Sequence, residues 1–318
     1  MTEPSTEATP EIASPPAVAA AQENISVARG ALFVIATYAL FPSSDAIAKH
    51  LTARLDVVQI IWAIFVFQAL IIVPVLLVRH GPGLLRTRRP GLQAVRALIT
   101  VISTLLYIKA LSFIALADAV AILMVTPLLV VALSVPLLRE RVGVRRWSAV
   151  VAGFAGALII IRPGLGVVHW ASLLVLASAL LFALFQIATR SLGLTDRPET
   201  TLIYVSGGAA IAASAVASFT WAAPAPELWG WLALAGVLSG GAHFAIIKAL
   251  QLDSPSLLAT FVYTELIAAT IIGYLFFGDF PDTMTLLGVT VIVLSGLYVL
   301  HREGSADDKK WPHRSAVG

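Results

Sequence analysis

Apolar stretches follow one another along this chain from residue 28 to residue 301, with short polar loops between them. A helix needs about 20 mostly apolar residues to cross the hydrocarbon core of a bilayer, which is ~30 Å thick. Each stretch is close to that length, so the pattern predicts an all-α membrane protein with ten transmembrane helices. The predicted spans are 29–49, 57–78, 93–112, 116–137, 144–162, 168–191, 200–221, 228–249, 256–277 and 284–301.

The scarcity of charged residues excludes a water-soluble globule. Only 12% of the residues are charged and 58% are hydrophobic, whereas soluble domains carry about 25% charged residues. The net charge of +3 does not indicate a nucleic-acid partner, because the basic residues lie in the loops between spans. The chain has no cysteine, which excludes a disulfide framework and a thiolate metal site. We expect no metal ion and no cofactor.

The two ends of the chain do not resemble folded domains. Residues 1–27 are rich in Pro, Ala, Glu and Thr, a composition typical of disorder, and residues 302–318 form a polar tail. Cytoplasmic loops of membrane proteins carry an excess of Lys and Arg. That excess places both tails in the cytoplasm. The arginines that set this orientation are Arg79, Arg86, Arg88, Arg89, Arg139, Arg141, Arg145, Arg146, Arg190 and Arg197.

A short motif occurs twice. Residues 108–111 read Ile-Lys-Ala-Leu, and residues 247–250 read the same. Each copy is followed by an apolar segment with one disruptive residue near its middle, which is Pro127 in the first copy and Glu265 in the second. Each block then reaches an acidic residue and a glycine-rich span. The chain therefore reads as two related halves.

The duplication predicts how the halves lie in the membrane. The two repeats cover residues 28–162 and 168–301, and each holds five predicted spans. Because five is odd, the second repeat enters the membrane from the side opposite to the first. Inverted repeats are typical of secondary transporters, whose binding site lies near the bilayer midplane between the repeats.

The repeated lysines, Lys109 and Lys248, then fall at the two mouths of the protein. We expect a gating or structural role for both. A lysine near a helix end can extend to the lipid headgroups, or it can pair with an acid across a closed gate. The nearest acids in the sequence are Asp118 and Asp253.

The segment 110–117, together with Pro127, Glu140 and the Gly-Phe-Ala-Gly run at 153–156, resembles the EamA-type domain of the drug/metabolite transporter superfamily. The resemblance extends over about residues 30–300. It implies ten helices in two inverted five-helix halves, alternating access, and a bacterial inner membrane or a similar plasma membrane. Members carry amino acids, purines, riboflavin, S-adenosylmethionine or drugs, and some import while others export.

One departure from the family concerns the second span. Many relatives have an arginine early in it, where this chain reads Trp62-Ala63-Ile64-Phe65. If that arginine holds an anionic group, this protein lacks the contact. Aromatic residues such as Trp62, Tyr107, Tyr204 and Tyr263 could instead stack on a planar ligand, or they could serve only in packing.

Ionisable residues within the spans are the main candidates for a binding or coupling site, because a charge at membrane depth costs ~2.5–3.5 kcal/mol. Glu265 lies in the middle of the ninth span and could bind a cationic group or exchange a proton. Alternatively, it is a protonated or paired acid that ties helices together. Asp45 lies one turn before Lys49 in the first span, so the two could line the pathway or simply form an ion pair. His243, in the eighth span, could titrate near neutral pH.

Several residues predict local distortion. Pro127 should kink the fourth span, and Thr126 could satisfy the carbonyl that the proline frees or line the cavity. Pro42, followed by two serines, predicts a local break in the first span. Gln186 is a polar group in the sixth apolar span, and we include it among the candidates for substrate binding or coupling.

A face of small residues runs along the fifth span. Ala149, Gly153 and Ala157 are spaced four apart, which permits close helix approach. We interpret this face as a packing surface within the protomer or as a homodimer contact, not as a ligand site.

The leading hypothesis is a secondary transporter for a small organic metabolite or drug, with proton coupling or facilitated diffusion both compatible with the sequence. One alternative is a flippase for lipids or lipid-linked sugars on the same fold. An intramembrane enzyme would need a paired nucleophile and base, and none is evident in the sequence. A membrane scaffold without transport would leave unexplained why the chain tolerates the free-energy cost of placing the Glu265 carboxyl group at membrane depth.

Overall fold

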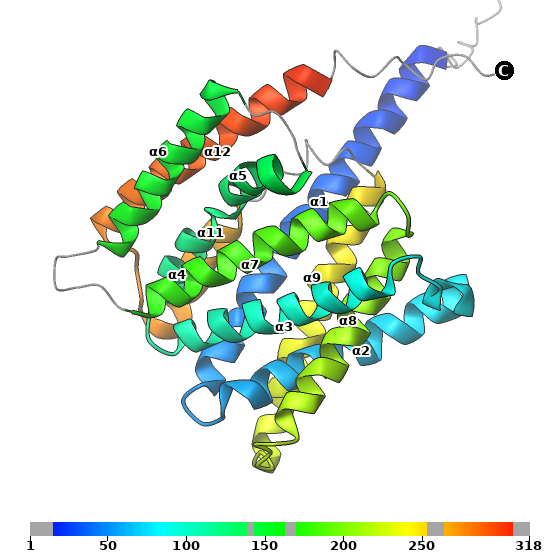
Figure 1. Ribbon diagram of the computed structural model, residues 1–318, viewed down its shortest axis with the longest axis vertical. Coiled ribbons are helices and arrows are strands. Elements are labelled where there is room, and N and C mark those ends of the chain that lie inside the picture. Colours follow the sequence, from blue (N-terminus) through cyan, green and yellow to red (C-terminus); the bar gives the residue numbers. More distant parts are fainter. Residues whose placement is uncertain (1–14, 139–142, 163–169, 253–263, 308–318) are drawn as a thin grey trace, which may run out of the picture.

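The computed structural model describes residues 15–138, 143–162, 170–252 and 264–307. Throughout these ranges the regular structure is helical, as predicted (Figure 1). The elements are α1 Pro15–Leu51, α2 Val57–His80, η1 Pro82–Leu85, α3 Pro90–Leu111, α4 Leu116–Leu123, α5 Thr126–Leu138, α6 Val144–Ile161, α7 Ala171–Leu192, α8 Pro198–Ala217, η2 Pro226–Leu228, α9 Trp229–Leu252, α11 Thr264–Phe277 and α12 Thr283–Asp307. α1 starts within the segment expected to be disordered, and α12 extends into the polar tail.

Within the described residues, six segments are long and apolar enough to cross a bilayer: Val57–His80, Pro90–Leu111, Leu116–Leu137, Ala171–Leu192, Pro198–Ala217 and Pro226–Ile246. Three shorter apolar helices accompany them, Trp147–Ile161, Thr264–Phe277 and Thr283–Tyr298. The prediction of an all-α, multi-pass membrane protein is confirmed. The count of ten spans stays a prediction.

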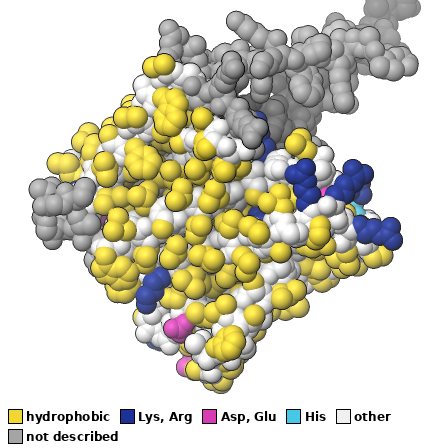
Figure 2. All heavy atoms as spheres, viewed as in Figure 1, with side chains coloured by type: hydrophobic (Ala, Val, Ile, Leu, Met, Phe, Trp, Pro, Cys, Tyr) yellow, Lys and Arg dark blue, Asp and Glu magenta, His cyan; other side chains and the backbone are white. Residues whose placement is uncertain are grey.

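The outer surface has the character of a protein that faces lipid. Hydrophobic side chains spread over the visible face, while Lys and Arg lie toward its edges (Figure 2). Large apolar side chains such as those of Leu70 and Ile211 are 63% and 74% exposed. In water such a surface would drive aggregation, whereas in hydrocarbon its exposure costs nothing.

The helices pair reciprocally across the two predicted repeats. α1 packs on α9 and α3 packs on α7, so the first helix of each repeat meets the third helix of the other. α2 packs on α8, and α6 packs on α12, which are the second and fifth helices of the two repeats (Figure 1). The pairs α2–α9 and α3–α8 are also reciprocal, because each joins the second helix of one repeat to the third helix of the other.

The predicted kink at Pro127 is confirmed as a break between two helices. α4 ends at Leu123 and α5 begins at Thr126. The Thr126 hydroxyl donates to the Leu123 carbonyl at 2.6 Å, and the Thr126 side chain is buried. Proline has no N–H to continue the helical ladder, so the hydroxyl satisfies a carbonyl that would otherwise stay unpaired.

The predicted break at Pro42 is wrong, because α1 runs through it without interruption. The Ser43 hydroxyl donates to the Ala39 carbonyl at 2.7 Å, and the Ser44 hydroxyl donates to the Ala235 carbonyl of α9 at 2.9 Å. Packing against α9 therefore keeps the helix intact where the local sequence alone favours a break.

The small-residue face of α6 packs within the protomer. Ala149 and Ala157 are buried, and α6 lies along α12. The backbones meet at Gly156 and Gly288: a Cβ added to Gly156 would lie 2.8 Å from the Gly288 carbonyl oxygen, and the reverse distance is 2.6 Å. The two helices can approach this closely only because neither glycine has a side chain.

The connection between α7 and α8 is fixed to the connection before α3 through Asp196. Its carboxylate accepts hydrogen bonds from the Thr87 hydroxyl, from the Arg88 N–H at 3.1 Å and from the Gln93 amide at 2.9 Å. Burial by itself would raise the pKa of Asp196, but these hydrogen bonds outweigh it and lower the pKa below its usual value. The ionised carboxylate is therefore the form that the fold stabilises.

We expect Gly156→Ala to destabilise the protein by about 1–3 kcal/mol, because the new methyl group overlaps the backbone of α12. Gly230→Ala is the control, since a Cβ there meets nothing within 4 Å, and it should change stability by at most about 0.5 kcal/mol. The measurement is reversible unfolding of the purified protein in detergent. Equal stabilities of the two variants would contradict the close α6–α12 contact.

Asp196→Asn should destabilise the protein by about 1–3 kcal/mol at pH 7, because the amide keeps one acceptor oxygen but puts an NH2 donor where the second carboxylate oxygen accepts a hydrogen bond. The folded-state pKa of Asp196 is lowered, so this contribution is fully present above its unfolded-state pKa and disappears as the pH falls through the lowered value. The difference between wild type and variant should therefore shrink toward pH 3. Thermal unfolding at both pH values, with the exposed Glu227→Gln as control, measures it. A difference that does not depend on pH would contradict this explanation.

Candidate functional site

Three predicted site residues converge from three helices. Tyr107 of α3 donates its hydroxyl to the Asp45 carboxylate of α1 at 3.2 Å, and Tyr107 is 7% exposed. Glu265, in the first turn of α11, lies within electrostatic range of both Asp45 and Tyr107. We call Asp45, Tyr107 and Glu265 the carboxylate cluster. It joins two helices of the first predicted repeat to one helix of the second.

The carboxylate cluster brings two acids together. Asp45 and Glu265 are half-buried, and among the side chains that the structure describes, which exclude that of Lys248, neither acid forms an ion pair. Tyr38 of α1, one more neighbour that senses the charge of Glu265, contributes a hydroxyl rather than a cation. Two acids so placed in a membrane require protons or a cationic ligand to offset the cost of their charge.

His243 of α9 packs beside α1, and its partners differ from those of the carboxylate cluster. Its Nδ1–H donates to the Ser239 carbonyl at 2.9 Å, and its ring meets Phe41 of α1 edge-on with centroids 5.0 Å apart. The neutral ring therefore keeps Nε2 as its acceptor. This geometry fixes the imidazole between α1 and α9 and leaves one nitrogen for a ligand or a proton.

Other candidates are used in packing. Trp62 donates its indole N–H to the Ser214 hydroxyl at 3.0 Å and meets Trp221 edge-on at 4.7 Å. The Tyr204 hydroxyl donates to the Leu85 carbonyl at 2.7 Å. These contacts assign Trp62 and Tyr204 to helix packing rather than to the carboxylate cluster. Gln186 is half-buried and has no hydrogen-bond partner in the described chain.

The repeated lysines are separate from the carboxylate cluster as far as the structure describes them. Lys109 is exposed, and its Nζ lies 5.4 Å from the centre of the Phe113 ring. Within the described ranges it does not pair with Asp118, so the alternative of an ion pair between these two is wrong. The side chain of Lys248, and Tyr263 and Asp253 as a whole, lie outside the described residues.

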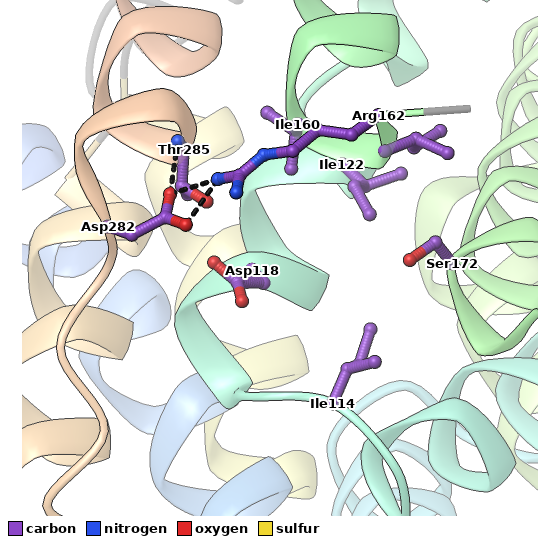
Figure 3. Close-up of a pocket in the computed structure, with 9 residues that line it drawn as sticks. Ile114, Asp118, Ile122, Ile160, Arg162, Ser172, Asp282 and Thr285 are labelled. Atoms are coloured by element: carbon purple, nitrogen blue, oxygen red, sulfur yellow. Dashed lines mark hydrogen bonds and ion pairs between the residues drawn. The ribbon is translucent and has the colours of Figure 1, made fainter. Parts of the chain in front are cut away.

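Asp118 lines a polar cavity at one end of the bundle (Figure 3). The cavity has a volume of about 130 Å³ and also contacts Arg162, Ser172, Asp282 and Thr285. Arg162 and Asp282 form an ion pair across it. The Arg162 guanidinium holds the pKa of Asp282 below its usual value, so this pair stays charged at neutral pH.

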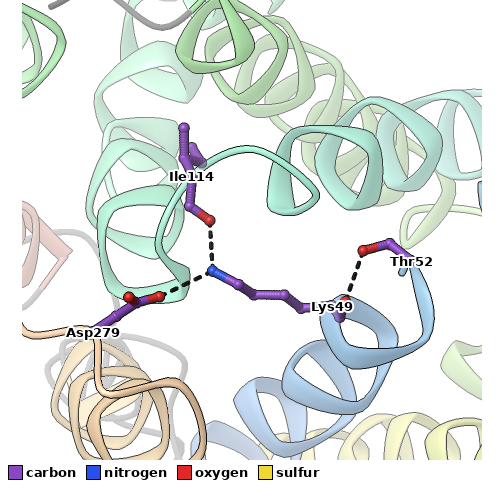
Figure 4. Close-up of polar contacts among 4 residues, drawn as sticks. All are labelled: Lys49, Thr52, Ile114 and Asp279. Atoms are coloured by element: carbon purple, nitrogen blue, oxygen red, sulfur yellow. Dashed lines mark hydrogen bonds and ion pairs between the residues drawn. The ribbon is translucent and has the colours of Figure 1, made fainter. Parts of the chain in front are cut away.

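Lys49 does not pair with Asp45, which corrects the alternative of an ion pair along α1. Its Nζ reaches across to Asp279 at 3.2 Å and donates to the Ile114 carbonyl at 2.7 Å (Figure 4). Asp45 is instead hydrogen-bonded by Tyr107. A spacing of four permits an ion pair within a helix, but partners on neighbouring elements satisfy both side chains in this bundle.

Sequence reasoning missed Arg96, which is 2% exposed within α3. It donates to the Thr201 carbonyl at 2.6 Å and to the Thr189 hydroxyl at 3.3 Å, and its guanidinium carbon lies 4.9 Å from the Phe185 ring centre. Arg96 therefore joins α3 to α7 and α8. The available signal was an arginine inside a predicted span, which by the cost of buried charge requires a partner.

Comparison with known proteins places the chain among transporters. The model of the EamA-like transporter family matches residues 28–162 and again residues 169–301. A riboflavin transporter of Rhizobium johnstonii is 28% identical, over 86% of this chain and 91% of the relative. An S-adenosylmethionine uptake transporter of Rickettsia conorii is 26% identical, over 84% and 91%.

Two further matches extend this picture. A pseudopaline exporter of Pseudomonas aeruginosa is 25% identical, over 84% of this chain and 94% of the relative. A solved crystal structure, described only as that of a protein, has the same fold, with a TM-score of 0.60 and 17% identity over 86% of this chain and 98% of the other. These relatives indicate transport rather than catalysis. Because the family model accounts for most of the sequence in two copies, the chain belongs to the EamA-like transporter family and is a multi-pass membrane transporter.

Proposed function

We propose that this protein is a secondary transporter that moves a small organic metabolite across the plasma membrane by alternating access. Two inverted five-helix halves would enclose the substrate and expose it first to one side and then to the other. The observation that carries the proposal is the convergence of Asp45, Tyr107 and Glu265 from α1, α3 and α11. Among the side chains that the structure describes, none of the cations pairs with either acid.

The energetics favour a transport role for the carboxylate cluster. A charged carboxylate at membrane depth costs ~2.5–3.5 kcal/mol on insertion scales, and two acids near one another add mutual repulsion. A protonated state or a bound cation removes both costs. The cluster would therefore exchange a proton or a positively charged group each time the site changes sides.

The reciprocal packing of the helices supports two halves related by a pseudo-twofold axis, and the odd number of five predicted spans in each half gives their inversion. If a pseudo-twofold axis relates the repeats, every contact between a helix of one repeat and a helix of the other has an exchanged counterpart. The pairs α1–α9 and α3–α7 have this relation, as do α2–α9 and α3–α8. In inverted-repeat transporters the binding site lies near this interface, and α1 and α11, which carry the two acids, contact each other across it.

The relatives suggest which substrates to examine first. The matched proteins are named for riboflavin, S-adenosylmethionine and pseudopaline, so we propose a small organic metabolite of similar polarity. The aromatic ring of Tyr107 lies beside Asp45 and would offer a surface for such a compound. The imidazole of His243, which packs on Phe41 of α1, would offer a second.

We expect purified wild-type protein in liposomes to accumulate at least one compound from a metabolite mixture that includes riboflavin and S-adenosylmethionine. Glu265→Gln should abolish any dependence of this uptake on a pH gradient, since the amide cannot carry a proton. Asp45→Asn should reduce uptake, and Tyr107→Phe should reduce it by about two- to tenfold, the value of one hydrogen bond. Mass spectrometry of the vesicle contents measures all three.

The control is Glu227→Gln, an exposed acid outside the carboxylate cluster, which should transport as the wild type does. Wild-type uptake by all three cluster variants would show that the site lies elsewhere. If the wild type moves no metabolite but scrambles labelled lipids, the protein is a flippase and the proposal is wrong.

A further inference from the structure

Two ion pairs join the first predicted repeat to the connection between α11 and α12. Lys49, at the end of α1, pairs with Asp279, and Arg162, just after α6, pairs with Asp282. Both acids lie within a few residues of one another in the second repeat, and both cations come from the first. At this end of the molecule, therefore, charges of the two halves meet beside contacts with apolar side chains, such as that of Lys49 with the Phe277 ring.

The backbone sets both pairs in place. Gly278 ends α11 with φ +71°, and the following N–H of Asp279 returns to the Gly273 carbonyl at 3.3 Å, a helix cap that directs the Asp279 side chain toward α1. Arg162 ends α6 with φ 52°, a left-handed conformation that is uncommon for a residue with a side chain. Such a conformation persists when the surroundings hold it.

The space behind the Arg162–Asp282 pair has both polar and isoleucine side chains in its lining, and two of its polar atoms lack hydrogen-bond partners in the described chain. The cavity of about 130 Å³ is lined by Asp118 and Ser172 as well as by the ion pair (Figure 3). One carboxylate oxygen of Asp118 and the Nε of Arg162 are buried without a hydrogen-bond partner in the described chain. The charge of Arg162 acts on Asp118 across this space, so Asp118 is a second acid within reach of the same guanidinium.

We propose that the Lys49–Asp279 and Arg162–Asp282 pairs close the extracytoplasmic end of the transport pathway, and that Arg162 passes from Asp282 to Asp118 when this gate opens. The proposal rests on the proposed transport function, and the basic-loop rule gives the side of the membrane. Alternating access requires that one end of the pathway is closed while the other is open. At this end, charges of the two halves meet directly, so breaking these contacts would open it.

The four side chains are partly exposed, which suits a contact that opens and closes better than a permanent structural contact. Lys49 and Asp279 are 15% and 38% exposed, and Arg162 and Asp282 are 23% and 55% exposed. Solvent screens pairs of this kind, so each contributes little and breaks readily. Asp118 would receive Arg162 in the open state, which keeps the guanidinium paired throughout the cycle instead of leaving it uncompensated.

The test uses the absence of native cysteine. Ser172 lines the cavity behind the gate and is 8% exposed, so Ser172→Cys places a single thiol there. A membrane-impermeant thiol reagent applied to intact cells should label this thiol slowly. Adding Asp282→Asn or Lys49→Gln should speed labelling by about two- to fivefold, the range that a screened ion pair gives. Adding Asp118→Asn should slow labelling, because the open state loses its acceptor for Arg162.

The matched control is Lys109→Ala, which removes an exposed lysine that stacks on Phe113 and forms no ion pair in the described chain. It should leave the labelling rate unchanged. The charge-swapped pair Lys49→Asp with Asp279→Lys should restore slow labelling. Arg162→Lys keeps the charge but loses the guanidinium Nη2 that contacts both carboxylate oxygens of Asp282, so it should give an intermediate rate. Thermal unfolding in detergent checks that each variant is folded.

Three outcomes would overturn the gate: labelling unaffected by Asp282→Asn and Lys49→Gln, no rescue by the charge swap, or faster labelling with Asp118→Asn. The labelling assay needs no transported substrate, so it separates the two proposals. A wild type that transports metabolites while these variants label normally would refute the gate alone. A wild type that transports no metabolite in liposomes would refute the proposed function, whatever the labelling rates.

Discussion

Each polar group between the two ends of this bundle must find its partner within the protein, because lipid hydrocarbon offers none. Gln68 shows how this is met: its amide donates to Ser206 of α8 at 3.0 Å, and its carbonyl accepts from Ser239 of α9 at 3.1 Å. Arg96 donates to Thr189 and Thr201 in a similar way, although its Nε has no hydrogen-bond partner in the described chain. Asp45 differs in that its carboxylate accepts from Tyr107 while Glu265, a second acid, lies within electrostatic range, and local departures of this kind are expected at sites of function.

The carboxylate cluster and the proposed gate share their helices. On α1, Lys49 follows Asp45 by one turn, and on α11, Glu265 opens the helix while Asp279 follows its end. α1 and α11 also contact each other. A ligand or proton that changes the charge at the cluster therefore acts on the same two rigid elements that carry the ion pair. Because rigid helices transmit such shifts along their length, occupancy of the site and opening of the gate would be linked without an additional relay.

The sequence predicted helices, approximate spans, the family and the break at Pro127, because each depends on local properties: length, apolar content and the missing proline N–H. It also predicted Asp45 and Glu265 as candidates from the cost of ionisable groups in a membrane, and Tyr107 as an aromatic surface for a planar ligand. It failed for Pro42, where packing on α9 keeps α1 continuous, and for the Asp45–Lys49 pair. Those outcomes depend on neighbours far away in the chain, and local spacing contains no information about them.

By itself, then, the sequence determined that the protein lies in a lipid bilayer, that it is helical and that it consists of two similar blocks. These properties depend only on the length of the apolar stretches and on the repetition of motifs, both of which can be read from the order of the residues. Only the tertiary structure decided which charges meet. Asp279 lies 230 residues from Lys49 in the sequence, and Asp282 lies 120 from Arg162. Such pairs form because α1 and α6 pack beside α11 and α12, and the direction of a side chain across a helix interface is fixed by that packing rather than by the sequence around it.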